Sequence, residues 1–131
     1  MDNTKQEQTG RRLIDLAWVG GLLDGEGCFS FYTSCPRISA ESTCRTVIEE
    51  VHRILGGKCY VVKRKTNLNR QVFRWSIVGK EALKLCPLVI PYLRDKREQA
   101  ELLSTVYDYP SGSAKRESIA KRLAALKKVS L

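Results

Sequence analysis

Between residues 19 and 27 the chain reads VGGLLDGEG, an apolar segment with two adjacent glycines that ends in two acids. Apolar residues recur at helical spacing from Leu13 to Leu23, which predicts a helix over residues 13–24. Gly20 and Gly21 each cost a helix about 1 kcal/mol relative to alanine, so a tertiary contact must compensate for them. The close approach of a second helix is one such contact, and we expect that helix to belong to a second copy of the chain. An ordinary core helix that ends in a glycine-rich turn is the alternative.

The end of this predicted helix carries two carboxylates, Asp24 and Glu26. A two-fold axis between two copies of the helix would bring their acidic ends together. The carboxylates would then repel one another, and they would also oppose the negative end of the helix dipole. A bound divalent cation relieves both effects, and a site built from oxygen ligands favours Mg²⁺.

The pattern before residue 79 alternates helices with pairs of strands. The predicted helices and strands of this part span residues 13–24, 28–32, 37–40, 43–55, 59–64 and 71–78. A turn is expected at residues 33–36, and Gly56 with Gly57 is expected to close the second helix. In the last strand, Phe73, Trp75 and Ile77 share the side that we expect to face the core.

Prolines and glycines divide the remaining chain into helices. A short helix over residues 79–86 is expected to stop before Pro87, Pro91 is expected to open the next helix, and a last helix follows a break at residues 110–113. The expected core positions of these last two helices are Leu93, Ala100, Leu103, Val106, Ile119, Leu123, Leu126 and Val129. The order predicts an α+β fold, with an antiparallel four-stranded sheet, helices on one face and the other face free for a ligand.

Composition points to a polyanionic partner. The 131 residues fit one domain, residues 11–131, behind a polar tail of residues 1–10. The 23 Lys+Arg against 14 Asp+Glu give a net charge of +9, which favours nucleic acid over an acidic membrane surface or a basic protein without such a partner. No stretch approaches the roughly 20 apolar residues of a membrane span, and no secretory signal begins the chain. We therefore expect an intracellular protein without a membrane partner.

Cysteine and histidine are placed unfavourably for a metal site. The five cysteines include no CxxC pair, and His52 is the only histidine. We expect His52 at the surface of the second helix, and most of the cysteines buried as small hydrophobic residues in a reducing compartment. The cysteines are Cys28, Cys35, Cys44, Cys59 and Cys86.

Residues 19–27 resemble the nine-residue motif that names the LAGLIDADG homing endonucleases, in the DGEG variant followed by Cys28-Phe29. The segment LGG before Tyr60 and the segment PYLRDK at residues 91–96 also resemble this family. The resemblance covers about residues 13–108 and is to the single-motif, homodimeric type. It implies the family's αββαββα fold, here with an added C-terminal helix.

The resemblance also implies an active site. Glu26 would hold a divalent metal with help from the backbone carbonyl of Gly25, and Lys96 would act at the scissile phosphate, whereas Asp24 is interpreted as structural. Members of the family often carry a glutamine early in the second helix. Residues 39–43 take that place here without one, so its water-positioning role would be vacant or pass to Glu41 or Ser39.

Gly20 and Gly21 match the motif positions at which two helices cross in a homodimer. The implied activity is Mg²⁺-dependent hydrolysis of both strands of a pseudo-palindromic duplex DNA site, with no small-molecule cofactor. The residues expected to contact DNA are basic or polar and lie on the free sheet face or around the second hairpin, namely Arg37, Ser39, Lys63, Arg64, Lys65, Asn69, Arg70, Gln71, Arg74 and Ser76.

A catalytically inactive DNA- or RNA-binding protein of the same fold, such as an intron maturase or a regulator, is the alternative. Retention of Glu26 favours the enzyme, because a protein that only binds has no need for clustered carboxylates beside phosphates. The missing glutamine and the first hairpin, which is shorter than the hairpin that the family usually carries there, favour the alternative.

Overall fold

The computed structural model describes residues 11–62 and 71–127 of the chain. The helices in these ranges are α2 (Leu13–Glu26), α3 (Arg45–Leu55), α4 (Lys80–Val89), α5 (Arg97–Ser104) and α6 (Ala114–Lys127), with 3-10 turns η1 (Ile90–Tyr92) and η2 (Val106–Asp108). The strands are β1 (Gly27–Tyr32), β2 (Cys35–Ser42), β3 (Lys58–Val62) and β4 (Val72–Val78). No helix of the described residues is long and apolar enough to cross a membrane.

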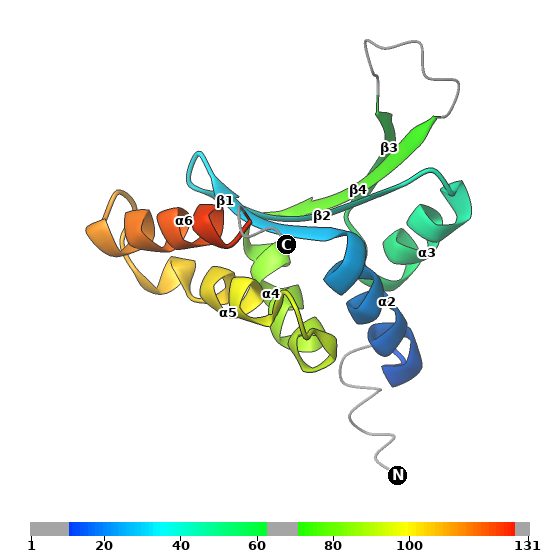
Figure 1. Cartoon of the computed structure of the whole chain (residues 1–131), viewed down its shortest axis with the longest axis horizontal. Coiled ribbons are helices and arrows are strands. Elements are labelled where there is room, and N and C mark those ends of the chain that lie inside the picture. The colour runs from blue at the N-terminus through cyan, green and yellow to red at the C-terminus, as the bar shows by residue number, and fades with distance from the viewer. Residues whose placement is uncertain (1–10, 63–70, 128–131) are drawn as a thin grey trace.

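The strands form one antiparallel sheet in the order β1-β2-β4-β3. All the labelled helices lie on one side of this sheet, and the opposite face is open (Figure 1). The α+β fold predicted from the sequence, with its helices on one face and an added C-terminal helix, is therefore confirmed. The β3–β4 hairpin extends beyond the helical layer at one side of the sheet.

The core lies between the sheet and the helices. Its two largest fully buried side chains, Trp75 and Phe29, come from β4 and β1. The indole Nε1 of Trp75 donates a hydrogen bond to the carbonyl oxygen of Gly56 at 2.6 Å, which ties the end of α3 to the sheet. Gly57 has a φ of +85°, and a Cβ there would lie 2.6 Å from the carbonyl oxygen of Ser76, so the predicted glycine closure of α3 is confirmed.

The first hairpin is tighter than the sequence predicted. Its turn consists of Thr33 and Ser34, both with positive φ, so β2 begins at Cys35 and includes Pro36. Pro36 is tolerated because it lies at the start of its strand, next to the turn, where a missing backbone N–H donor disturbs the sheet least. β2 also continues to Ser42, and α3 begins only at Arg45. Residues 39–42, which we matched to the place of the family's second-helix glutamine, therefore lie in a strand, which extends two residues past the predicted end at residue 40.

The helical region after β4 departs from the predicted boundaries. Pro87 lies inside α4 instead of ending it, because buried Cys86 and Val89 anchor the helix on both sides of the proline. Pro91 opens only the short turn η1, and α5 begins six residues later. The predicted core positions Leu93, Ala100, Leu103, Val106, Ile119 and Leu123 are buried nonetheless. Leu126 is partly buried, and Val129 lies outside the described residues.

The prediction that most cysteines are buried is wrong. Only Cys86 is buried, whereas Cys44 and Cys59 are exposed and Cys28 and Cys35 are intermediate; all five are free thiols. Cys59 lies on β3 at the edge of the sheet, where the helices do not cover it. His52 is exposed on α3, as predicted.

Candidate functional site

The end of α2 presents an uncovered carboxylate. Gly25 and Glu26 form the last two residues of the helix, and both are exposed. Within the described ranges, no side chain or backbone group pairs with the Glu26 carboxylate. A free carboxylate at the negative end of a helix dipole is electrostatically unfavourable, which makes this position receptive to a cation.

Lys96 lies at the same helix end. Its ammonium nitrogen Nζ donates to the carbonyl oxygen of Asp24 at 2.9 Å and lies 3.5 Å from that of Leu23. Both carbonyls belong to the last turn of α2, so the lysine charge complements the negative end of the helix. The structure thus brings Gly25, Glu26 and Lys96 together at one place.

The Asp24 side chain holds this arrangement from the other side. Its Oδ1 accepts hydrogen bonds from the backbone N–H groups of Lys96 at 2.9 Å and Arg94 at 3.1 Å. Burial alone would raise the pKa of Asp24, but these backbone donors, that of Asp95 and the charge of Lys96 outweigh it, so the pKa lies below its ordinary value. The role of Asp24 is therefore to dock the loop before α5 onto the end of α2.

The two motif glycines face different environments. A Cβ on Gly20 would lie 2.6 Å from Cβ of Tyr92, so Gly20 is small because η1 packs against it within the same chain. Gly21 is exposed, and a Cβ there would meet nothing within 4 Å. The expectation that both glycines serve a helix crossing between subunits is corrected for Gly20, which a second copy cannot reach because the residue is buried.

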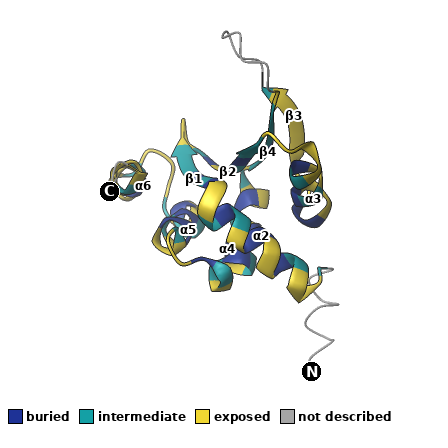
Figure 2. Cartoon of the chain, turned by 45° about the vertical axis from the view of Figure 1, so that its right-hand side comes forward, coloured by how far each residue is buried: buried dark blue, intermediate teal, exposed yellow. Residues whose placement is uncertain are grey.

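Gly21 belongs to an exposed stripe along α2. Ile14 and Trp18 precede it at helical spacing and are 66% and 43% exposed, and Gly25 follows it one turn later. Figure 2 shows exposed residues along the outward side of this helix. Large apolar side chains in a row on a helix surface are typical of an interface, so this stripe is the candidate subunit contact.

A cavity of about 490 Å³ connects the end of α2 with the sheet. Glu26 lines it from α2, and Glu41 and Ser42 line it from the end of β2. The second carboxylate is thus close to the first in the fold, although 15 positions separate them in the sequence. Within the described part of the chain, no group of three or more metal-binding side chains of the histidine, cysteine, aspartate or glutamate type occurs.

The strand register assigns side chains to the open face. Trp75, Phe29 and Ile38 are fully buried against the helices, so the residues that alternate with them point to the opposite side. The predicted DNA contacts Arg37, Ser39, Arg74 and Ser76 all lie on this open face. The register adds the residues that oppose them on the neighbouring strands, namely Cys28, Ser30, Glu41, Lys58 and Tyr60.

The sequence did not reveal Lys58 and Tyr60 as members of this face. The segment from Tyr60 onward reads YVVKRK, in which apolar and polar residues do not alternate, so its side assignment depends on pairing with β4. Lys58 pairs with Ser76 and Tyr60 pairs with Arg74, so both residues lie on the open face with their partners.

Arg74 is held on the open face by its neighbours on both sides. Its Nε donates to Glu41 Oε1 at 2.7 Å, and its Nη2 donates to the same oxygen. Its guanidinium carbon lies 6.0 Å from the centroid of the Tyr60 ring. Hydrogen bonds to Glu41 and Tyr60 raise the pKa of Arg74 despite its partial burial. We refer to these three residues as the Glu41–Arg74–Tyr60 row.

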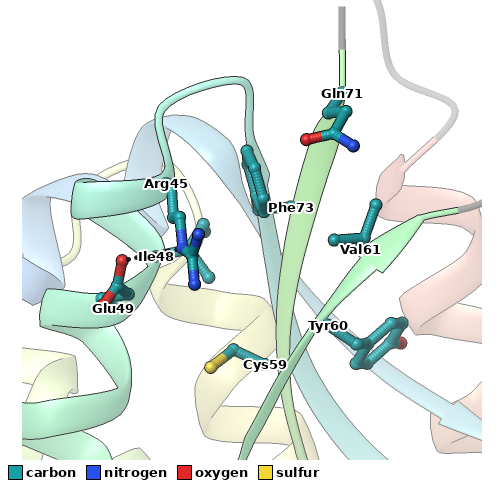
Figure 3. A pocket seen from close by; sticks show the side chains of 8 residues that line it. All are labelled: Arg45, Ile48, Glu49, Cys59, Tyr60, Val61, Gln71 and Phe73. Carbon is teal, nitrogen blue, oxygen red and sulfur yellow. Dashed lines mark ion pairs between the residues drawn. The ribbon is translucent and has the colours of Figure 1, made fainter.

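Gln71, which we predicted as a DNA contact around the second hairpin, lies beside α3. Gln71 lines a cavity of about 460 Å³ between α3 and the β3–β4 hairpin, together with Ile48 and Phe73 (Figure 3). Arg45 and Glu49 of α3 border this cavity and form an ion pair at 3.1 Å. Gln71 thus lies on the helix side of the sheet, because it alternates with Val72. Lys63, Arg64, Lys65, Asn69 and Arg70 lie outside the described residues.

No family model and no curated protein matches the sequence. Solved structures do match. The homing endonuclease I-CvuI, in complex with its target in the presence of 2 mM Ca, superposes with a TM-score of 0.72 at 20% identity, over 90% of this chain and 85% of that chain. The chain has the homing-endonuclease fold.

Two further structures support this fold. I-CvuI with the I-CreI target in the presence of 2 mM Mg, in which the DNA is not cleaved, gives a TM-score of 0.66 at 20% identity over 89% of this chain and 84% of that chain. The archaeal intron-encoded homing endonuclease I-Vdi141I, complexed with DNA, gives 0.69 at 16% identity over 90% of this chain and 87% of that chain. The resemblance noted in the sequence is confirmed at the level of the fold.

Proposed function

We propose that this chain is a site-specific DNA endonuclease, which acts as a homodimer and hydrolyses both strands of a pseudo-palindromic duplex site with a divalent metal, Mg²⁺. The observation that carries the proposal is the position of the free Glu26 carboxylate. It stands at the border between the exposed stripe of α2 and the open sheet face that carries Arg37, Lys58 and Arg74. The solved proteins that share the fold are homing endonucleases in complex with DNA, which supports the same reading.

The open face fits duplex DNA. The surface of this single antiparallel sheet can lie along the major groove, which admits a two-stranded β-ribbon. Its arginine and lysine side chains supply charge for the phosphates, and its serine hydroxyl groups can bond to base edges or phosphates. The net charge of +9 adds long-range attraction to the polyanion.

The α2 stripe fits a two-fold contact. If Ile14, Trp18 and Gly21 pack against the same residues of a second subunit across a two-fold axis, each subunit places its Glu26 near that axis. The symmetry of the protein then matches that of a pseudo-palindromic site, and each subunit addresses one half-site. Exchange of Trp18 for glutamate should give a folded monomer, which sedimentation velocity would detect.

The oxygen ligands at the end of α2 suit a hard divalent cation. Glu26 offers a free carboxylate in the last turn of α2, and oxygen ligands of this type suit Mg²⁺ better than softer metals. Glu26 and the Gly25 carbonyl would hold the ion, with the partner copy and DNA phosphates supplying further oxygens. When bound, such an ion activates water and stabilises charge on the phosphate oxygens. Lys96, held at the same helix end, contributes positive charge beside the scissile phosphate.

The deciding experiment compares the wild type with Glu26→Gln on a pool of duplex DNA, with and without Mg²⁺. The proposal expects Mg²⁺-dependent cleavage by the wild type alone, with DNA binding retained by both proteins. Asp95→Asn serves as a control, because Asp95 is exposed and lies in the neighbouring loop. Cleavage retained by Glu26→Gln would rule out the metal role of Glu26. A wild type that binds as a dimer but never cleaves would instead support the inactive binding protein.

A further inference from the structure

The Glu41–Arg74–Tyr60 row orients one edge of the Arg74 guanidinium. The Glu41 carboxylate contacts the edge formed by Nε and Nη2. The other edge, formed by Nη1 and the second N–H of Nη2, is directed away from Glu41. Tyr60 directly opposes Arg74 on β3 and is also hydrogen bonded to it, which limits movement of the guanidinium toward that strand. Because the guanidinium is planar, fixing one edge also fixes the direction of the two parallel donors on the other.

The same pairing makes Arg74 unsuited to a nonspecific phosphate contact. Glu41 neutralises its charge across adjacent strands, and the two side chains are only 34% and 36% exposed. Arg37 lies on the same face with no partner among the described residues, and it is exposed. Phosphate attraction depends on unneutralised charge, whereas base recognition depends on donors with a fixed direction. The open face therefore holds two arginines with different properties.

We propose that Arg74 recognises a guanine in the major groove, and that Glu41 is the positioning residue for this contact. Guanine presents O6 and N7 as two adjacent acceptors, which match the two parallel donors of an arginine. The guanine lies in the inner part of each half-site, because Glu41 and the proposed metal ligand Glu26 line the same cavity. The inference rests on the proposed function, since it names a feature of the DNA that the same face would bind.

The test selects sequences from a randomised duplex pool by binding in the presence of Ca²⁺, and then measures affinity for the selected site and for single-base variants. The wild type should select one fixed guanine per half-site near the dyad. Arg74→Ala and Arg74→Lys should each lose at least about tenfold of the preference for guanine at that position alone. Arg37→Ala is the matched control. It should weaken binding to all sequences alike and lower the slope of log affinity against log salt by about one.

Glu41→Ala separates positioning from simple charge. Release of Arg74 should relax the guanine preference at the same position and steepen the salt dependence, because the freed charge can then pair with phosphate. A purely structural role for Glu41 would leave the salt slope unchanged. Selected sites without an inner guanine, or an unchanged preference in both Arg74 variants, would overturn the inference but leave the endonuclease proposal standing. Failure of the wild type to bind any duplex would overturn both.

Discussion

The carboxylate of Asp24 and the backbone N–H of Lys96 lie 2.9 Å apart, while the Lys96 ammonium lies 2.9 Å from the carbonyl oxygen of Asp24. Each residue therefore satisfies a polar group of the other. The pair joins the end of α2 to the loop that precedes α5, across 72 positions of sequence. This contact fixes where the helix end, and with it Glu26, lies relative to the rest of the domain.

Asp24→Asn should reduce the free energy of unfolding near neutral pH by about 1 kcal/mol, because a neutral acceptor forms weaker hydrogen bonds with the two N–H donors. The pH dependence carries a clear sign. The folded-state pKa of Asp24 lies below the ordinary 3.8, so its stabilising contribution is complete above that value and is lost as pH falls through the lower folded-state pKa. The variant should lack this acid-dependent loss.

Urea unfolding at a series of acidic pH values measures the effect. Asp95→Asn is the control, because it removes one carboxylate charge from the loop that Asp24 binds, and no side-chain hydrogen bond of Asp95 occurs within the described structure. A parallel pH dependence in the wild type and Asp24→Asn would mean that the docking contact contributes nothing to stability.

Gly20→Ala should destabilise the fold, although alanine is the better helix former. The added Cβ would lie 2.6 Å from Cβ of Tyr92, an atom next to the backbone that cannot move without η1. Overpacking of this kind costs about 1–3 kcal/mol, against about 1 kcal/mol gained in helix propensity. The neighbouring Gly21→Ala meets no atom and should not destabilise the isolated subunit. Thermal unfolding at low protein concentration distinguishes the two variants, and equal melting temperatures would contradict the packing argument.

The sequence predicted the parts of this structure that depend on local pattern. The motif helix, both hairpins and the glycine closure of α3 follow from spacing and turn residues that lie within one segment. Gly20 and Gly21 look alike in the sequence, however, and only the distant Tyr92 distinguishes them. Likewise, Pro87 stays inside α4 because buried neighbours outweigh its local tendency to end a helix.

The candidate site shows the same limit. Glu26 and Lys96 were predicted from a motif and from a short segment that resembles the same family. Glu41 and Tyr60 acquire their positions beside Arg74 only through strand register, which a segment without clear alternation does not encode locally. Gln71 was predicted only as part of the hairpin tip, and its place beside α3 follows from its alternation with Val72 at the start of β4.

Arg116→Lys should lower the free energy of unfolding by about 1 kcal/mol. The Nε of Arg116 donates to the carbonyl oxygens of Tyr109 at 2.7 Å and Val106 at 3.0 Å, and its guanidinium lies 5.0 Å from the Tyr107 ring centroid. Lysine has no donor at the Nε position and cannot stack as a plane. Arg122→Lys is the control, because Arg122 pairs with Glu98 on the surface with both side chains more than half exposed. Equal urea midpoints for the two variants would show that Arg116 does not anchor α6.

The thiols should react in an order set by burial. Cys44 and Cys59 are exposed and should be modified first by a thiol reagent at mildly alkaline pH, followed by the partly buried Cys28 and Cys35. Burial raises the pKa of Cys86 to about 12, so its thiol stays protonated at mildly alkaline pH. Burial also keeps the reagent from the sulfur, so this residue should react only when the protein unfolds. Mass spectrometry of peptides after timed labelling identifies each site. Cys44→Ser should remove part of the fast phase without changing the rest, whereas rapid labelling of Cys86 in the folded protein would show that the α4 side of the core opens far more readily than its packing implies.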